Sequence, residues 1–181
     1  MIASRVIHRV LVLAAAALLG GCFYSDDALI SWRQADFPIE RGVYSHTPYH
    51  PDGRPFDRPT WEGEIRRSGR AYSSEVADFP HEGVRLRELS PGLFAAMKPD
   101  EEYFLYGLVT VYPDGVVTYH QPRCSELQAA DLSRYDVEEH AEEPGFCRVD
   151  DWDRLHGVLL TYLGAMDGNL PIDGVYRQQA D

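Results

Sequence analysis

The stretch that decides the fold is residues 103–120, YFLYGLVTVYPDGVVTYH. Nine of its first ten residues are aromatic, aliphatic or β-branched, a composition typical of a strand buried in a sheet. Pro113–Gly115 follows, in which proline presets φ and glycine accepts a left-handed conformation. Val116–His120 then leads the chain back. The pattern predicts a β-hairpin whose first strand, Tyr103–Tyr112, lies at the centre of the sheet.

The segments before this hairpin predict further strands of an antiparallel meander. Apolar and polar residues alternate over 61–66 and again over 84–87, as in half-buried strands. Five prolines between residues 38 and 59 forbid a helix there, so 46–60 is expected to be an irregular loop. Further short strands are expected at 39–44, 71–75 and 93–97.

The chain after the hairpin is helical in character. Ser125 and Gln128 are spaced as a capping box for a short helix that ends near Leu132. A longer helix is expected over 152–163, with Asp150 or Asp151 as its cap and Gly164 as its stop. Its apolar stripe consists of Trp152, Leu155, Leu159, Tyr162 and Leu163.

These elements predict an α+β fold. We expect a curved antiparallel sheet of five to seven strands, either a meander or a small open barrel, with the C-terminal helix packed on it. A lipocalin-like barrel is disfavoured, because Gly42–Tyr44 lacks the tryptophan that this family usually carries near its start.

Two cysteines are expected to form a disulfide. Cys124 and Cys147 are the pair that remains once Cys22 is assigned to the leader described next, and no CxxC spacing favours metal or redox chemistry. A bond between them closes a loop of about 24 residues, which the chain-entropy model values at roughly 3.5 kcal/mol.

The first 22 residues carry an export signal. Arg5 and Arg9 precede an apolar run at 10–19 that is too short to span a bilayer, which needs about 20 helical residues. Leu19–Cys22, LGGC, resembles the lipobox of bacterial lipoproteins. The resemblance implies cleavage before Cys22, attachment of a diacylglycerol to its sulfur and acylation of the new amino group.

This resemblance also implies a location. Phe23 follows the cysteine where an inner-membrane retention signal often has aspartate, so we expect the outer membrane, with the domain facing the periplasm. The chain would then divide into a signal peptide at 1–21, a lipidated tether at 22–27 and one α+β domain at 28–181. We therefore expect the membrane itself to be a partner, because two or three acyl chains anchor a protein stably in a bilayer.

Charge limits the other partners. The formal net charge is −12 at pH 7, which argues against nucleic acid and against electrostatic adhesion to anionic lipid. An envelope protein or a glycan remains a possible partner.

Three groups of residues are candidate sites. Tyr103, Tyr106 and Tyr119 belong to an aromatic-rich sheet and are expected either to line a ligand groove or to fill the core. The acidic stretch from Glu126 to Asp153 has ligand types suited to calcium but not the EF-hand spacing, so a solvated acidic loop is the preferred interpretation. The histidines are scattered, so no metal site and no cofactor is expected.

No catalytic signature of the HExxH, GxSxG, Walker A or GxGxxG type is present in the sequence. We therefore expect a non-enzymatic protein: a membrane-anchored interaction or envelope-maintenance module that binds through its sheet face. The first alternative is a small-ligand-binding sheet or barrel with an internal pocket. The second is a metal-dependent hydrolase that uses histidines and carboxylates.

Overall fold

The computed structural model describes residues 23–141, 143 and 145–179. The expected signal peptide and Cys22 lie outside this part of the chain. The described residues form eleven strands, two α-helices and one short 3-10 helix. In chain order they are β1 (Phe23–Ser25), β2 (Gly42–Pro48), β3 (Trp61–Ser68), β4 (Ala71–Ser73), β5 (Arg85–Ser90), β6 (Leu93–Pro99), β7 (Phe104–Val111), β8 (Val117–His120), η1 (Cys124–Glu126), α2 (Ala129–Arg134), β9 (Glu138–Glu139), β10 (Cys147–Arg148), α3 (Trp152–Ala165) and β11 (Gly174–Gln178).

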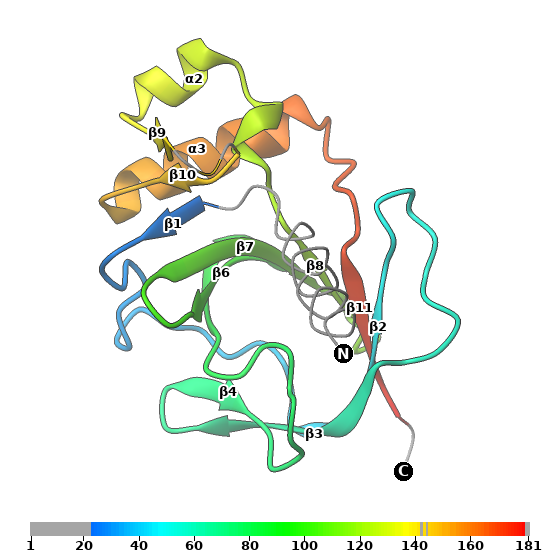
Figure 1. Cartoon of the computed structure of the whole chain (residues 1–181). Helices are drawn as coiled ribbons and strands as arrows, with labels where there is room; N and C mark the ends of the chain where they lie inside the picture. Colours follow the sequence, from blue (N-terminus) through cyan, green and yellow to red (C-terminus); the bar gives the residue numbers. More distant parts are fainter. Residues whose placement is uncertain (1–22, 142, 144, 180–181) are drawn as a thin grey trace, which may run out of the picture.

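The strands form one curved, open sheet (Figure 1). Its main path is β4-β3-β2-β11-β8-β7, and β6 and β5 continue from the far edge of β7. These pairs are antiparallel, whereas β1 pairs in parallel with β10, so the sheet as a whole is mixed. The expected α+β class, with a curved sheet, a C-terminal helix and one disulfide, is confirmed. The sheet has more strands than expected because β1, β9, β10 and β11 were not predicted; the first three are only two or three residues long.

Curvature brings β4, at one end of the sheet, near the chain that leads into β5 at the other end. The backbone N–H of Gly83 donates to the carbonyl of Tyr72 at 2.9 Å, and the N–H of Tyr72 donates to the carbonyl of Val84 at 3.0 Å. These bonds join β4 to the residues just before β5, but they do not extend into a ladder, so the sheet does not close into a barrel.

The central hairpin is confirmed. β7 and β8 pair in antiparallel register, with Val109 opposite Tyr119 and Val111 opposite Val117. The turn closes through the N–H of Gly115 donating to the carbonyl of Tyr112 at 3.0 Å, and Gly115 has φ +80°. The positive φ is the reason that glycine is required there.

Apolar side chains fill both faces of the sheet. Alternation along β6 sends Phe94 and Ala96 into the concave side, while Ala95 and Met97 point to the face covered by α3. The convex core contains Phe23, Tyr106 and the buried stripe of α3, namely Leu155, Val158, Leu159 and Tyr162. The sheet therefore offers neither face of its centre as an open binding surface.

The helix and the disulfide complete the convex core. Asp151 caps α3 by accepting from the N–H of Arg154 at 2.9 Å. Cys124 and Cys147 are bonded and fully buried, with their Cα atoms 6.2 Å apart. This bond ties the segment before α2 to β10, beside β1.

Two predicted boundaries are wrong. The tether at 22–27 is not a free linker, because Phe23–Ser25 form β1, buried between β7 and β10. His46 does not begin a loop, since β2 continues to Pro48 through its pairing with β11. Long-range pairing decides both cases, and no local pattern reveals it.

Two predicted helix ends are also wrong. α3 runs one residue past Gly164, and the chain turns at Asp167 and Gly168, which have φ +49° and +75°. Ser125 lies inside the short 3-10 helix rather than at a cap, and Gln128 precedes α2 without a side-chain capping bond.

Candidate functional site: a cavity inside the curved sheet

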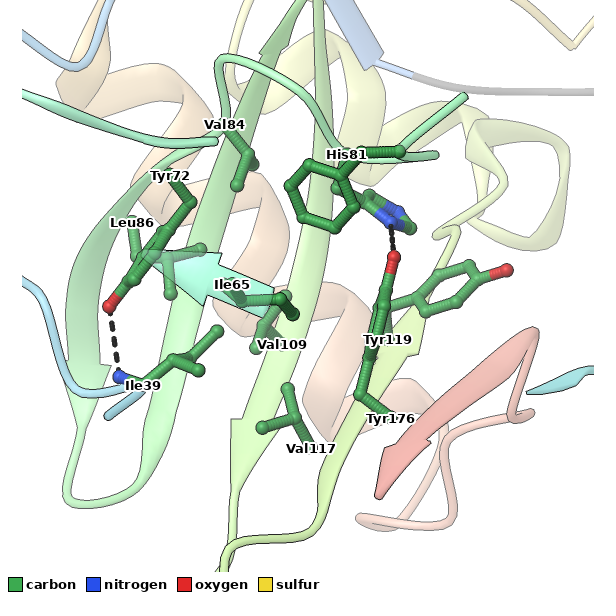
Figure 2. A pocket seen from close by; sticks show the side chains of 11 residues that line it. Ile39, Ile65, Tyr72, His81, Val84, Leu86, Val109, Val117, Tyr119 and Tyr176 are labelled. Carbon is green, nitrogen blue, oxygen red and sulfur yellow. Dashed lines mark hydrogen bonds between the residues drawn. The ribbon is translucent and has the colours of Figure 1, made fainter. Parts of the chain in front are cut away.

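The concave side of the sheet contains a cavity of about 30 Å³ (Figure 2). Its wall is predominantly aliphatic and aromatic, with the edges of one histidine and three tyrosines among the apolar side chains. The lining residues are Ile39, Ile65, Tyr72, Phe79, His81, Val84, Leu86, Val109, Val117, Tyr119 and Tyr176.

Strand alternation supplies most of the wall. Ile65 of β3, Val109 of β7, Val117 of β8 and Tyr176 of β11 all point to the concave side. Figure 2 shows Tyr72 at the opposite end from His81, with its hydroxyl accepting a hydrogen bond from the N–H of Ile39 at 2.9 Å.

The loop between β4 and β5 closes the other end of the cavity. It contributes Phe79 and His81, and the ring of Phe79 lies 4.8 Å from that of Trp61. His81 Nδ1 forms a 2.6 Å hydrogen bond with the hydroxyl of Tyr176, which fastens the loop to β11 (Figure 2). The loop therefore covers this end of the cavity, held by the His81–Tyr176 hydrogen bond and by the Phe79–Trp61 contact.

A second histidine–tyrosine pair lies beside the first. Nε2 of His46 is 3.2 Å from the hydroxyl of Tyr119, and its Nδ1 is 3.0 Å from Oγ1 of Thr60. The ring of His46 also lies 4.7 Å from that of Tyr176. The two pairs thus form one polar cluster at the edge of an apolar cavity.

Burial keeps this cluster uncharged near neutral pH. Desolvation lowers the pKa of His46 to about 4. Desolvation, with smaller contributions from His46 and Lys98, lowers the pKa of His81 to about 3. Burial raises the pKa of Tyr119 and Tyr176 above the ordinary tyrosine value. The site therefore has hydrogen-bonding groups but no charge with which to hold an ionic ligand.

Gly174 of β11 makes room for the Tyr119 ring. A Cβ at this position would lie 2.2–2.5 Å from three atoms of that ring, Cε1, Cζ and the hydroxyl oxygen. Only glycine allows Tyr119 to lie over β11 and reach His46, so the backbone at residue 174 positions the second pair.

The three tyrosines predicted as ligand residues do not converge. Tyr119 lines the cavity, but Tyr106 lies on the opposite face, where its hydroxyl is 2.7 Å from Oγ of Ser25. The ring of Tyr103 stacks edge-on with that of Tyr24 at 5.1 Å. The prediction of a groove lined by all three tyrosines is therefore wrong.

The acidic stretch is dispersed through ion pairs. Arg148 bridges Asp26 and Asp150 at 2.8 and 2.9 Å, and Arg154 bridges Asp136 and Asp151, both at 3.0 Å. Within the described residues, no three histidine, cysteine, aspartate or glutamate side chains gather where they could hold a metal ion. The hypothesis of a metal-dependent hydrolase requires three converging metal ligands, and the described part of the chain does not bring three together.

Sequence reasoning missed His81 and Tyr176 as site residues. They are 95 positions apart, and neither occurs in a motif. A weak signal was present: β11 begins with Gly174, and glycine in a strand often marks a close approach by another group.

The chain matches no protein family, no curated protein and no solved structure. None of the helices in the described part of the chain is both long and apolar enough to cross a membrane.

Proposed function

We propose that this protein is a lipid-anchored, non-catalytic binding module of the bacterial cell envelope, located at the outer membrane and facing the periplasm. Its cavity receives an apolar group of a partner protein or envelope component. The observation that carries the proposal is the apolar cavity inside the curved sheet, closed at one end by a loop and edged by neutral histidine–tyrosine pairs.

The size of the cavity indicates what it holds. A site needs roughly 10–15 Å³ for one water molecule, so a cavity of about 30 Å³ accepts a small group rather than a whole cofactor. Apolar cavities of this kind stay dry and bind apolar groups. An aliphatic side chain or the end of a short aliphatic chain fits this description, and such a buried anchor is typical of binding hot spots.

The position of β1 supports a close anchor. β1 begins at Phe23, the residue after the proposed lipidation site, and its three residues are buried in the sheet. Consecutive Cα atoms are about 3.8 Å apart, so acyl chains on Cys22 would hold the domain against the membrane without a linker. A partner within the membrane or at its surface would therefore be reached directly.

Cross-linking in intact cells tests the binding role. A photoreactive amino acid at Val76, an exposed residue of the covering loop, is expected to form a discrete adduct. Val117→Ile adds one methylene to the cavity wall and is expected to remove that adduct. Val43→Ile is the matched control, because Val43 is 49% exposed on β2 and lies outside the cavity.

Two results would contradict the binding role: no adduct at Val76, or an adduct that Val117→Ile and Val43→Ile affect equally. Thermal unfolding of both variants verifies that each remains folded. Anchoring is tested separately by labelling cells with radioactive palmitate. The wild-type chain is expected to incorporate the label and Cys22→Ser to lose it, whereas label in both chains, or in neither, would refute lipidation at Cys22.

A further inference from the structure

Four arginines gather on the surface where the loop after β1 meets the β3–β4 hairpin, away from the cavity. In Figure 1 this loop, drawn in blue, descends from β1 towards β4. We call this group the arginine surface; it consists of Arg33, Arg67, Arg70 and Arg85.

Aromatic rings hold two of these arginines. The guanidinium carbon of Arg33 lies 4.7 Å from the ring centre of Trp32. The guanidinium carbon of Arg67 lies 3.9 Å from the ring centre of Phe37. Stacking of this kind restricts long side chains before any ligand arrives, which lowers the entropy cost of binding.

Arg85 joins the group through the backbone of the same loop. Its Nη1 donates to the carbonyl of Ile30 at 3.2 Å, two residues before Trp32. Its Nε is buried and has no hydrogen-bond partner in the described structure. This nitrogen is closed off from solvent, so Arg85 contributes to the surface through its charge and not through a free donor at Nε.

No carboxylate lies within ion-pairing distance of the arginine surface among the described residues. Elsewhere on the surface, Arg41, Arg54, Arg148 and Arg154 each form ion pairs with carboxylates. Within the described residues, none of the four arginines of this surface forms an ion pair. The carboxylate of Asp36, in the same loop, accepts instead from the N–H of Glu88 at 2.8 Å.

Two other charges of this surface repel Arg70. Desolvation, followed by the charges of Arg67 and Arg85, lowers the pKa of Arg70. Like charges held together without an internal partner are stabilised when an external anion binds between them.

We infer that the arginine surface is a binding site for a phosphate-bearing ligand. Phosphate offers three or more acceptor oxygens that several guanidinium forks can share, whereas a single carboxylate offers two. The net charge of −12 opposes long polyanions such as nucleic acid, so a compact anion is favoured. The exposed indole of Trp32, 43% accessible, lies beside the charges and suits a ligand that also has an apolar part.

Calorimetric titration of the full-length chain with inorganic pyrophosphate tests this site. Saturable binding is expected, and the double variant Arg67→Gln/Arg70→Gln is expected to weaken it by about tenfold or more. Arg134→Gln/Arg177→Gln is the matched control, because it removes the same charge from exposed positions on α2 and β11. The control is expected to bind as the wild type does.

A second titration, with monomeric dihexanoyl phosphatidic acid, distinguishes a lipid headgroup from a soluble phosphate. Tighter binding than pyrophosphate, lost in Arg67→Gln/Arg70→Gln, assigns the site to lipid; equal or weaker binding assigns it to a soluble phosphorylated ligand. Absence of pyrophosphate binding by the wild type, or equal weakening in the two double variants, would overturn the proposal. Arg33→Gln is a milder variant for use if Arg67→Gln/Arg70→Gln unfolds.

Discussion

Replacing His46 by glutamine is expected to remove part of the acid sensitivity of the fold. His46 is 3% exposed, and burial lowers its pKa from 6.5 to about 4. Between these two values the unfolded chain binds a proton that the folded chain excludes, so folding loses stability as the pH falls. The contribution is complete above about pH 6.5 and is lost progressively towards pH 4.

The magnitude follows from proton linkage. With a pKa of 6.5 in the unfolded chain and about 4 in the fold, lowering the pH from about 7 to about 5 costs about 2 kcal/mol at this one residue. Glutamine has an amide that can still meet Thr60 and Tyr119 but does not titrate. His46→Gln should therefore lose about 2 kcal/mol less than the wild type over the same interval.

Urea unfolding at the two pH values, with the disulfide intact, measures this difference. His50→Gln is the control, because His50 is exposed and lies outside the cluster. It is expected to lose as much stability as the wild type on acidification. If His46→Gln and the wild type lost the same free energy between the two pH values, the reasoning from burial would be refuted.

Three further changes test the packing. Replacing both disulfide cysteines by alanine is expected to lower the free energy of unfolding by about 2–5 kcal/mol, measured by urea unfolding. Without the bond, the unfolded chain is no longer cross-linked between two residues that are 23 positions apart, so it gains conformational entropy. Gly174→Ala should lower the free energy of unfolding by about 1–3 kcal/mol and shift the NMR signals of the Tyr119 ring. At Gly164 a Cβ meets nothing within 4 Å, so Gly164→Ala should raise the free energy of unfolding by about 0.5–1 kcal/mol. Equal effects of the two variants would contradict the close approach of Tyr119 to Gly174. Asp151→Ala should lower stability by about 1 kcal/mol in thermal unfolding, through loss of the cap of α3, and no change would show that the cap is dispensable.

Local signals predicted the elements that depend on neighbouring residues. The turn at Pro113–Gly115, the apolar spacing along α3 and the pairing of the two buried cysteines all follow from chemistry within a short stretch or from cysteine arithmetic. The fold class followed because such elements can bury their apolar faces in only a few ways.

The candidate site could not be predicted in the same way. His81 reaches Tyr176 from a loop without periodicity, and the side chain of Arg85 donates to the carbonyl of Ile30, 55 positions away. β1 is a strand only because β7 and β10 offer it hydrogen bonds on both edges. Each of these contacts depends on where distant segments meet.

The sequence by itself determined the hairpin, the helix, the disulfide and the α+β class, because periodicity and turn chemistry act over a few residues. Tertiary structure alone decided which aromatic residues share a cavity. Val109 lies opposite Tyr119, so these two point to the concave side, while Tyr106, three residues earlier on β7, points to the helix. Side chains alternate with a period of two, and a register different by one residue would have reversed these faces.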